Sequence, residues 1–152
     1  MNRRARRSRP SPQVAEVAVD PGTGQVKVTK LTTVHDSGTV LNHLSYQGQI
    51  DGGVVTGLGF ALMEDNSLVD GRMVTANLGE FKMATVADVP KLTTVLMQDA
   101  SGPTPFEGKA IAEIPNVPTA AAIANAIEVA VGVRLYDLPL TSEKVYGALN
   151  GR

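Results

Sequence analysis

The chain has 152 residues, of which 43% are hydrophobic and 19% are charged, and its formal net charge is -1. This composition is typical of one globular domain and excludes a disordered or membrane-spanning chain. The sequence contains no cysteine, so it supplies no disulfide, no thiolate metal ligand and no iron–sulfur ligand.

The beginning of the chain is strongly basic, with five arginines among the first ten residues: Arg3, Arg4, Arg6, Arg7 and Arg9. This run lacks the interleaved aromatic residues of nucleic-acid-binding modules, and no apolar export segment follows it. No stretch approaches the roughly 20 apolar residues of a membrane span. We therefore expect a disordered, solvated leader at 1–13 and one domain at 14–152, with no nucleic-acid or membrane partner and a cytoplasmic location.

The first predicted element is a β-hairpin. Apolar and polar residues alternate over 14–20 and again over 25–34, with a Pro-Gly-Thr-Gly turn at 21–24 between them. The polar residues at 35–38 are expected to end the second strand. A long helix is then predicted over 41–63, because this stretch contains no proline and spaces its apolar residues as a helix does.

The predicted long helix is unusual for its glycines at positions 48, 52, 53, 57 and 59, each of which costs about 1 kcal/mol relative to alanine inside a helix. Two pairs, Gly48 with Gly52 and Gly53 with Gly57, are spaced four residues apart and so share a face. Such a smooth face allows either close packing against a neighbouring element or the approach of a ligand. The residues alone leave both interpretations open.

The second half of the chain is predicted to hold a hairpin, a strand and two helices. Asp70-Gly71 is a strong two-residue turn signal inside 67–74. The later predictions are an irregular segment at 77–90, a strand at 92–98, a loop at 101–105, a helix at 119–131 ended by Gly132, and a helix to 149 capped by Thr141. The predicted fold class is α+β, with hairpins first and interleaved helices.

Few ionisable side chains are placed for catalysis or metal binding. His35 and His43 are not accompanied by cysteine or by an acidic cluster, so they do not predict a metal site, and a lone histidine is more often structural. Glu113 lies among small and apolar residues at 107–115. Partial desolvation there would raise its pKa and suit it to general-base catalysis, but an exposed surface glutamate explains the residue equally well.

Several short motifs follow one another along the chain. The segments 36–42 and 48–53, the latter reading Gly-Gln-Ile-Asp-Gly-Gly, come first. The segments 108–113, reading Gly-Lys-Ala-Ile-Ala-Glu, and 118–127 come later. In this order they resemble the late cofactor segment and the Lys-Gly-Val-Gly-Glu motif of the xanthine dehydrogenase and aldehyde oxidase family of molybdenum hydroxylases. The resemblance spans about 14–149.

This resemblance implies a molybdenum-cofactor-binding domain of the xanthine dehydrogenase type, which is the C-terminal fragment of a larger subunit. It implies oxidative hydroxylation of an aldehyde or an N-heteroaromatic substrate, with water as the source of oxygen and Glu113 as the general base. The resemblance implies that the side-chain amide of Gln49 hydrogen-bonds an oxygen ligand of the molybdenum. It also implies that residues 108–110 line the cofactor, with backbone N–H groups as donors. The residues implied at the cofactor are Gln49, Gly48, Gly52, Gly53, Gly108, Lys109 and Ala110.

Three positions depart from the family's pattern. Ala110 and Ala112 stand where glycine is usual, and a methyl group there crowds a loop that needs close approach or a positive φ. His43 stands where proline is common.

The resemblance also implies a cofactor and partners. The cofactor is molybdenum bound by molybdopterin, with the cytosine dinucleotide form left open, and this chain itself binds no iron–sulfur cluster and no flavin. The implied partners are the remaining segment of the molybdenum subunit, an iron–sulfur subunit, an FAD subunit and a small aldehyde or heterocycle. Two classes of function remain open: a catalytic portion active only within a complex, and a truncated remnant or assembly domain without activity of its own.

Overall fold

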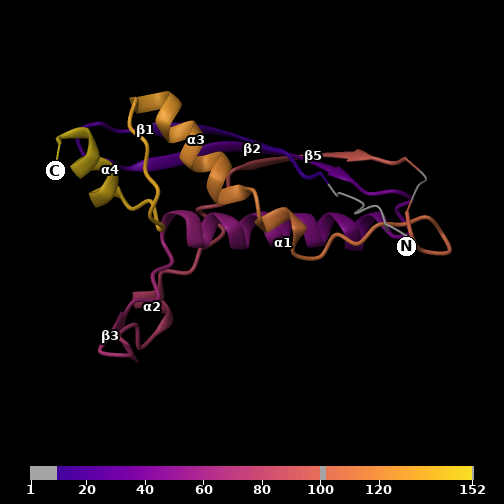
Figure 1. Cartoon of the computed structure of the whole chain (residues 1–152), viewed down its shortest axis with the longest axis horizontal. Coiled ribbons are helices and arrows are strands. Elements are labelled where there is room, and N and C mark those ends of the chain that lie inside the picture. The colour runs from indigo at the N-terminus through magenta and orange to yellow at the C-terminus, as the bar shows by residue number, and fades with distance from the viewer. Residues whose placement is uncertain (1–9, 100–101, 152) are drawn as a thin grey trace, which may run out of the picture.

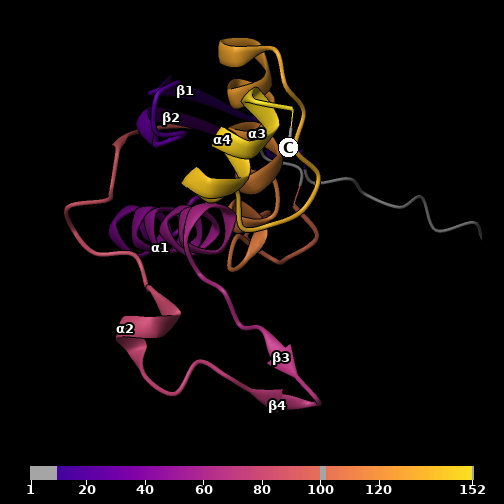
Figure 2. The ribbon, with the colours of Figure 1, turned by 90° about the vertical axis from the view of Figure 1, so that its left-hand side faces the viewer.

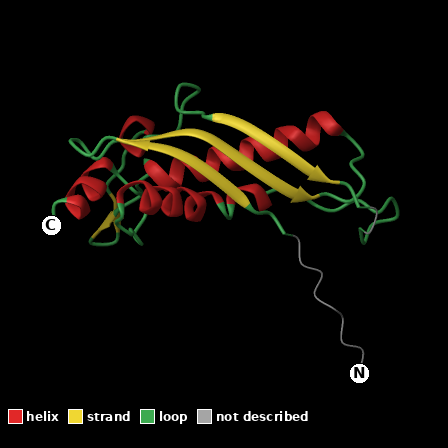
Figure 3. Ribbon diagram, turned by 90° about the horizontal axis from the view of Figure 1, so that it is seen from above, coloured by secondary structure: helices red, strands yellow, loops and turns green. Residues whose placement is uncertain are grey.

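The computed structural model describes residues 10–99 and 102–151. Its longest elements form two layers, a three-stranded sheet and a set of helices packed on one face of it (Figure 1). The strands are β1 (Gln13–Val19), β2 (Val26–Asp36) and β5 (Lys91–Met97), in the order β1-β2-β5. Seen end-on in Figure 2 and from above in Figure 3, the helices cover one face of the sheet and leave the other open.

The predicted first hairpin is present as β1 and β2, which pair antiparallel. The backbone pairing of β2 continues ahead of β1, since the N–H of Val34 donates to the carbonyl of Pro12 over 3.0 Å and that of Asp36 donates to the carbonyl of Pro10 over 3.4 Å. Of the leader expected at 1–13, residues 1–9 lie outside the described residues, whereas 10–13 run along β2 as part of the fold.

β5 pairs with β2 in parallel, from Lys30 opposite Lys91 to Asp36 opposite Met97. Parallel neighbours need a long crossover, which is commonly a helix. Here the crossover contains α1 (His43–Leu62), whose N-cap is Asn42 and which confirms the predicted long helix. The strand itself was predicted from its β-branched residues, but its partner was not.

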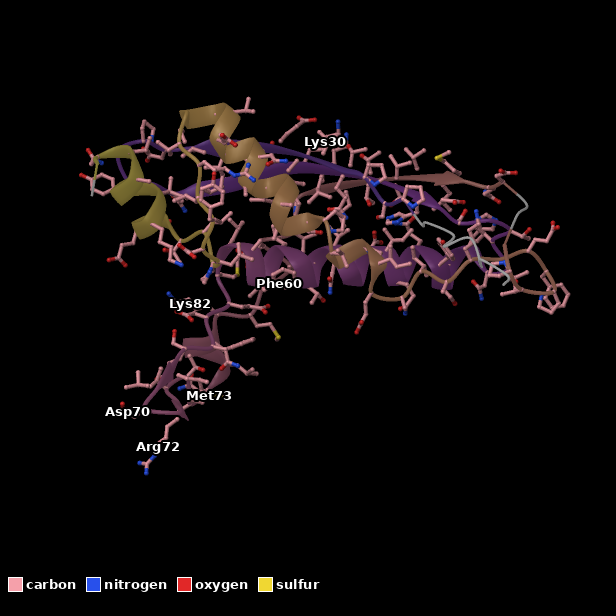
Figure 4. All side chains as sticks on the ribbon, viewed as in Figure 1. Lys30, Phe60, Asp70, Arg72, Met73 and Lys82 are labelled. Carbon is pink, nitrogen blue, oxygen red and sulfur yellow. The ribbon has the colours of Figure 1, made fainter. Side chains whose placement is uncertain are left out.

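Between α1 and β5 the chain leaves the two layers as an arm, residues 64–90, which projects from one end of the molecule in Figures 2 and 4. The predicted turn lies at its tip, where Asp70 and Gly71 have φ values of 50° and 75°, as a two-residue hairpin turn requires. The arm contains β3 (Leu68–Val69), β4 (Arg72–Met73) and a short helix, α2 (Leu78–Phe81).

The remaining helices complete the layer under the sheet. Both α3 (Thr119–Val131), ended by Gly132 in the left-handed conformation, and α4 (Ser142–Leu149), capped by Thr141, lie where the sequence predicts them. A short 3₁₀ helix, η1 (Ile114–Asn116), was not predicted. The largest side chains buried between these layers are Leu31, Ile50, Leu58, Ile123, Ile127 and Leu140. The fold is α+β, as expected.

One apolar stretch of 18 residues, Ile114–Val131, is long and apolar enough by composition to cross a membrane. A core helix passes the same test, and this stretch contacts both β1 and α1. Ile123 and Ile127 are 0% and 1% exposed in the core, which accounts for the apolar character of the stretch.

Candidate functional site

A groove of about 490 Å³ lies between the exposed side of α1 and the turn at 112–116, which leads into and includes η1. It brings together four of the α1 residues predicted at a cofactor with the predicted catalytic glutamate. The residues that line it are Gly48, Gln49, Gly52, Gly53 and Thr56 of α1 and Ala112, Glu113 and Asn116 of the turn.

Sequence reasoning missed two polar residues of this groove, Thr56 and Asn116. Thr56 continues the spacing of Gly48 and Gly52 by four more residues, so the helical period was a sufficient signal for it. Its hydroxyl donates to the carbonyl of Gly52 over 2.9 Å, which leaves oxygen lone pairs as acceptors. Asn116 had no comparable signal, because its place in the groove depends on η1.

The two glycine pairs of α1 serve different purposes. A Cβ atom built on Gly48 or Gly52 would meet no other atom within 4 Å. A Cβ on Gly53 would lie 3.0 Å from the Cβ of Pro115, and one on Gly57 would lie 2.6 Å from the Cβ of Thr119. The second pair therefore permits close packing of α1 against η1 and α3, whereas the first keeps the groove open.

Glu113 is exposed and caps the start of η1 without a side-chain hydrogen bond to it. Of the two interpretations that the sequence left open for Glu113, the exposed position is the one found in this chain. Pro115 is buried against Gly53, and Ile114 is half-buried, so these neighbours turn toward the core and do not enclose the carboxylate. A group that shields the Glu113 carboxylate from water therefore has to come from residues other than Ile114 and Pro115.

The predicted cofactor loop at 108–110 does not line the groove. The N–H of Gly108 donates to Oγ1 of Thr104 over 2.9 Å, and the N–H of Lys109 donates to the carbonyl of Ser37 over 3.0 Å. The expectation that these two N–H groups face a cofactor therefore needs correction, because both are used within the chain. Ala110 is exposed.

Ala112 has a φ of 26°, which agrees with the idea that its position favours glycine. L-residues rarely adopt positive φ, because Cβ then lies close to the backbone carbonyl. Ala110, the other alanine in a family glycine position, does not share this conformation. The two departures from the family's pattern are therefore not equivalent: only the one beside Glu113 strains the backbone.

His35 is held by two hydroxyl groups within the chain. His35 is 1% exposed, with Nδ1 3.0 Å from Oγ of Ser11 and Nε2 2.7 Å from Oγ1 of Thr33. Burial lowers the pKa of His35, which favours the neutral ring. Within 10–99 and 102–151 no group of three or more His, Cys, Asp or Glu side chains is placed to hold a metal ion.

The groove offers a carboxylate from Glu113, amides from Gln49 and Asn116 and a hydroxyl from Thr56. Its described lining contains no lysine or arginine, so it has no cation to bind a phosphate group. This donor and acceptor set, beside an open glycine surface, fits a flat heterocycle with amide-like edges.

Comparison with known proteins gives consistent matches. Residues 11–90 match the molybdopterin cofactor-binding domain family. The chain is 36% identical to the xanthine dehydrogenase molybdenum-binding subunit of Escherichia coli O157:H7, over 86% of this chain and 18% of that protein. The chain thus spans less than a fifth of that relative.

Two solved structures have the same fold. The aldehyde oxidoreductase from Desulfovibrio gigas aligns with a TM-score of 0.82 and 38% identity, over 90% of this chain and 15% of its own. Quinoline 2-oxidoreductase from Pseudomonas putida 86 aligns with a TM-score of 0.83 and 28% identity, over 90% of this chain and 18% of its own.

We predict opposite effects of alanine at two glycines of α1. Gly52→Ala should stabilise the chain by about 1 kcal/mol, because alanine favours the helix and its Cβ meets no neighbour. Gly57→Ala should destabilise it, because the new Cβ collides with Thr119. Urea unfolding followed by circular dichroism measures both. Equal losses of stability would contradict the assignment of Gly52 to an open surface.

We also predict that Ala112→Gly is better tolerated than Ala110→Gly. Glycine relieves the positive φ at position 112 but only adds conformational entropy to the unfolded chain at position 110. The two variants should differ in unfolding free energy by about 1 to 2 kcal/mol. If denaturant unfolding gave them the same stability, the strain assigned to Ala112 would be refuted.

Proposed function

We propose a function on the premise that this chain belongs to the molybdopterin cofactor-binding domain family. The chain forms one wall of a molybdenum-cofactor site and contributes a general base, Glu113, to oxidative hydroxylation of an aldehyde or an N-heteroaromatic compound. The observation that carries this proposal is the groove in which Gln49 and Glu113, from segments far apart in the sequence, line the same space.

The residues of the groove fit the cofactor that the family binds. Gly48 and Gly52 leave the surface of α1 free of side chains, so a flat pterin can approach the helix backbone. Amide and hydroxyl groups of Gln49, Asn116 and Thr56 match the mixed donors and acceptors of a pterin edge. When bound, the molybdenum–pterin cofactor supplies the two-electron redox chemistry.

Glu113 is the group proposed to move a proton. An ionised carboxylate accepts a proton on one of its oxygens, and a well-placed general base contributes about 10² to 10⁴ to the rate. Because Glu113 is exposed in this chain, the proposal requires another segment of the longer protein to cover the groove and exclude water.

Gln49 is proposed to orient the reacting oxygen from the opposite wall of the groove. Its side-chain amide both donates and accepts hydrogen bonds, and it comes from α1, whereas Glu113 comes from the turn at 112–116. Gly53 shapes this wall by packing on Pro115. Of the predicted cofactor loop, Ala110 is the exposed residue and stays available for cofactor contact.

The rest of the site is proposed to come from partner segments. The chain covers only 18% of its xanthine dehydrogenase relative, and its arm presents apolar side chains to solvent. The exposed large apolar residues of the arm are Leu68, Val69, Met73, Val74, Leu78, Met83 and Val86. We expect the remaining segment of the molybdenum subunit to contact this chain. Iron–sulfur and FAD subunits are expected to accept the electrons. The complex is expected to be located in the cytoplasm.

The proposal is tested by isolating the chain with its partners. A tagged chain purified from its native host should retain molybdenum in stoichiometric amount together with a larger polypeptide. Elemental analysis and mass spectrometry measure the two. A chain recovered alone and without molybdenum would contradict a cofactor-binding role and favour the second candidate, a remnant or assembly domain whose exposed arm serves only association.

In the molybdenum-loaded complex, we predict that Glu113→Gln lowers kcat by at least about 100-fold, because glutamine cannot accept the proton. Molybdenum content should not change. Glu107→Gln is the matched control, since Glu107 is an exposed carboxylate of the neighbouring loop that does not line the groove. Loss of molybdenum together with activity would indicate a structural role for Glu113 and overturn the general-base assignment.

A further inference from the structure

A partly buried ion pair joins β2 to the loop that precedes Glu113. Nζ of Lys109 lies 2.5 Å from Oδ1 of Asp36, and the two side chains are only 10% and 17% exposed. Asp36 is the last residue of β2. Lys109, expected from the sequence to contact a cofactor, therefore directs its charged group to a carboxylate within the chain.

The backbone around this pair is tied at several points. Gly38 and Gly108 form an antiparallel bridge, and the N–H of Thr39 donates to the carbonyl of Glu107 over 3.1 Å. Gly38 has a φ of 58°, and a Cβ on it would lie 2.3 Å from the carbonyl oxygen of Glu107. This approach requires glycine, so the loop lies directly against the end of β2.

Asp36 also acts on the helix that forms the other wall of the groove. The hydroxyl of Tyr46, in the first turns of α1, is buried and has no hydrogen-bond partner among the described residues. Burial and, secondarily, the negative charge of Asp36 raise the pKa of Tyr46. Asp36 thus pairs directly with Lys109 of the loop, and its charge also influences Tyr46, three residues before Gln49.

Only a few residues of the chain separate Lys109 of this ion pair from Glu113. Ile111 is 9% exposed and packs in the core with Leu31, Ile50 and Val54. Its carbonyl accepts the N–H of Ile114 over 2.9 Å, closing the turn around Glu113. Lys109 and Ile111 are therefore consecutive anchors on one side of Glu113, and the buried Pro115 is the anchor on the other.

An ion pair that is largely withdrawn from water is not explained by stability alone. Removing two charges from water offsets much of their attraction, so apolar residues often serve equally well in the interior. What an ion pair adds is a directional constraint between two specific atoms. Here that constraint joins the segment carrying Glu113 to the end of β2.

We propose that Asp36 and Lys109 are positioning residues that hold Glu113 at the geometry required for proton transfer. This inference rests on the proposed function of Glu113 and concerns how the chain places that carboxylate. It assigns Lys109 a role through Glu113, and not a contact with the cofactor.

The test is kinetic and uses the molybdenum-loaded complex. Lys109→Met, which keeps the length of the side chain and removes its charge, should lower kcat by about 10- to 100-fold, the usual effect of misplacing a catalytic group by about 1 Å. KM and molybdenum content should stay unchanged. Lys109→Arg should recover most of the activity, because it restores the cation.

A comparison in the Glu113→Gln background identifies the route of the effect. If Lys109 acts through Glu113, Lys109→Met should cause no further loss of kcat in that background. A multiplicative loss there would overturn the proposal and indicate a separate role. The matched control is Lys30→Met, which removes the exposed ion pair between Lys30 and Glu16 and should leave kcat unchanged (Lys30 is labelled in Figure 4).

Two further outcomes are decisive. If Lys109→Met loses molybdenum or does not assemble, Asp36→Asn/Lys109→Met is measured, because the double variant removes both charges of this pair. A double variant that also loses molybdenum would mean that the pair is only structural, which refutes the proposal.

Full activity of Glu113→Gln would refute the proposed function, whereas full activity of Lys109→Met beside an inactive Glu113→Gln would refute only this inference.

Discussion

The close approach of α1 to η1 and the start of α3 is the constraint on which the rest of the site depends. Because Gly53 and Gly57 have no side chains, Pro115 and Thr119 can pack directly on the helix. The side chain of Gln13 ties β1 to the same junction: its Nε2 donates to the carbonyl of Pro115 over 2.6 Å, and its Oε1 accepts the Thr119 hydroxyl over 2.9 Å. Sheet, helix and turn therefore meet at one point.

This junction determines what lies beside it. With η1 held against Gly53, the turn at 112–116 has to pass along α1, and Glu113 comes next to the open glycines of the helix. The other end of the same segment is held by the ion pair between Asp36 and Lys109. The positive φ of Ala112 lies between these two attachments, where the chain has to join fixed ends over few residues.

The site is open on the side that faces away from the sheet. Glu113 and Gln49 are both exposed, and so are the large apolar side chains of the arm at 64–90 among the described residues. The relatives that share this fold are several times longer, since the chain aligns with only 15% to 18% of the two solved structures. The exposure of the groove and of the arm agrees with a domain that functions as one part of a larger subunit.

The sequence by itself determined the local elements and the family. Alternation, helical spacing and the residues at caps and turns depend on near neighbours, so they predicted the first hairpin, α1, α3 and α4, and the ordered motifs indicated the molybdopterin-binding family. Only the tertiary structure decided the parallel pairing of β2 with β5, the partner of Lys109, the exposure of Glu113 and the different purposes of Gly52 and Gly57. Each of these depends on contacts between segments far apart in the chain, and no local pattern records which distant residue will lie opposite a given side chain.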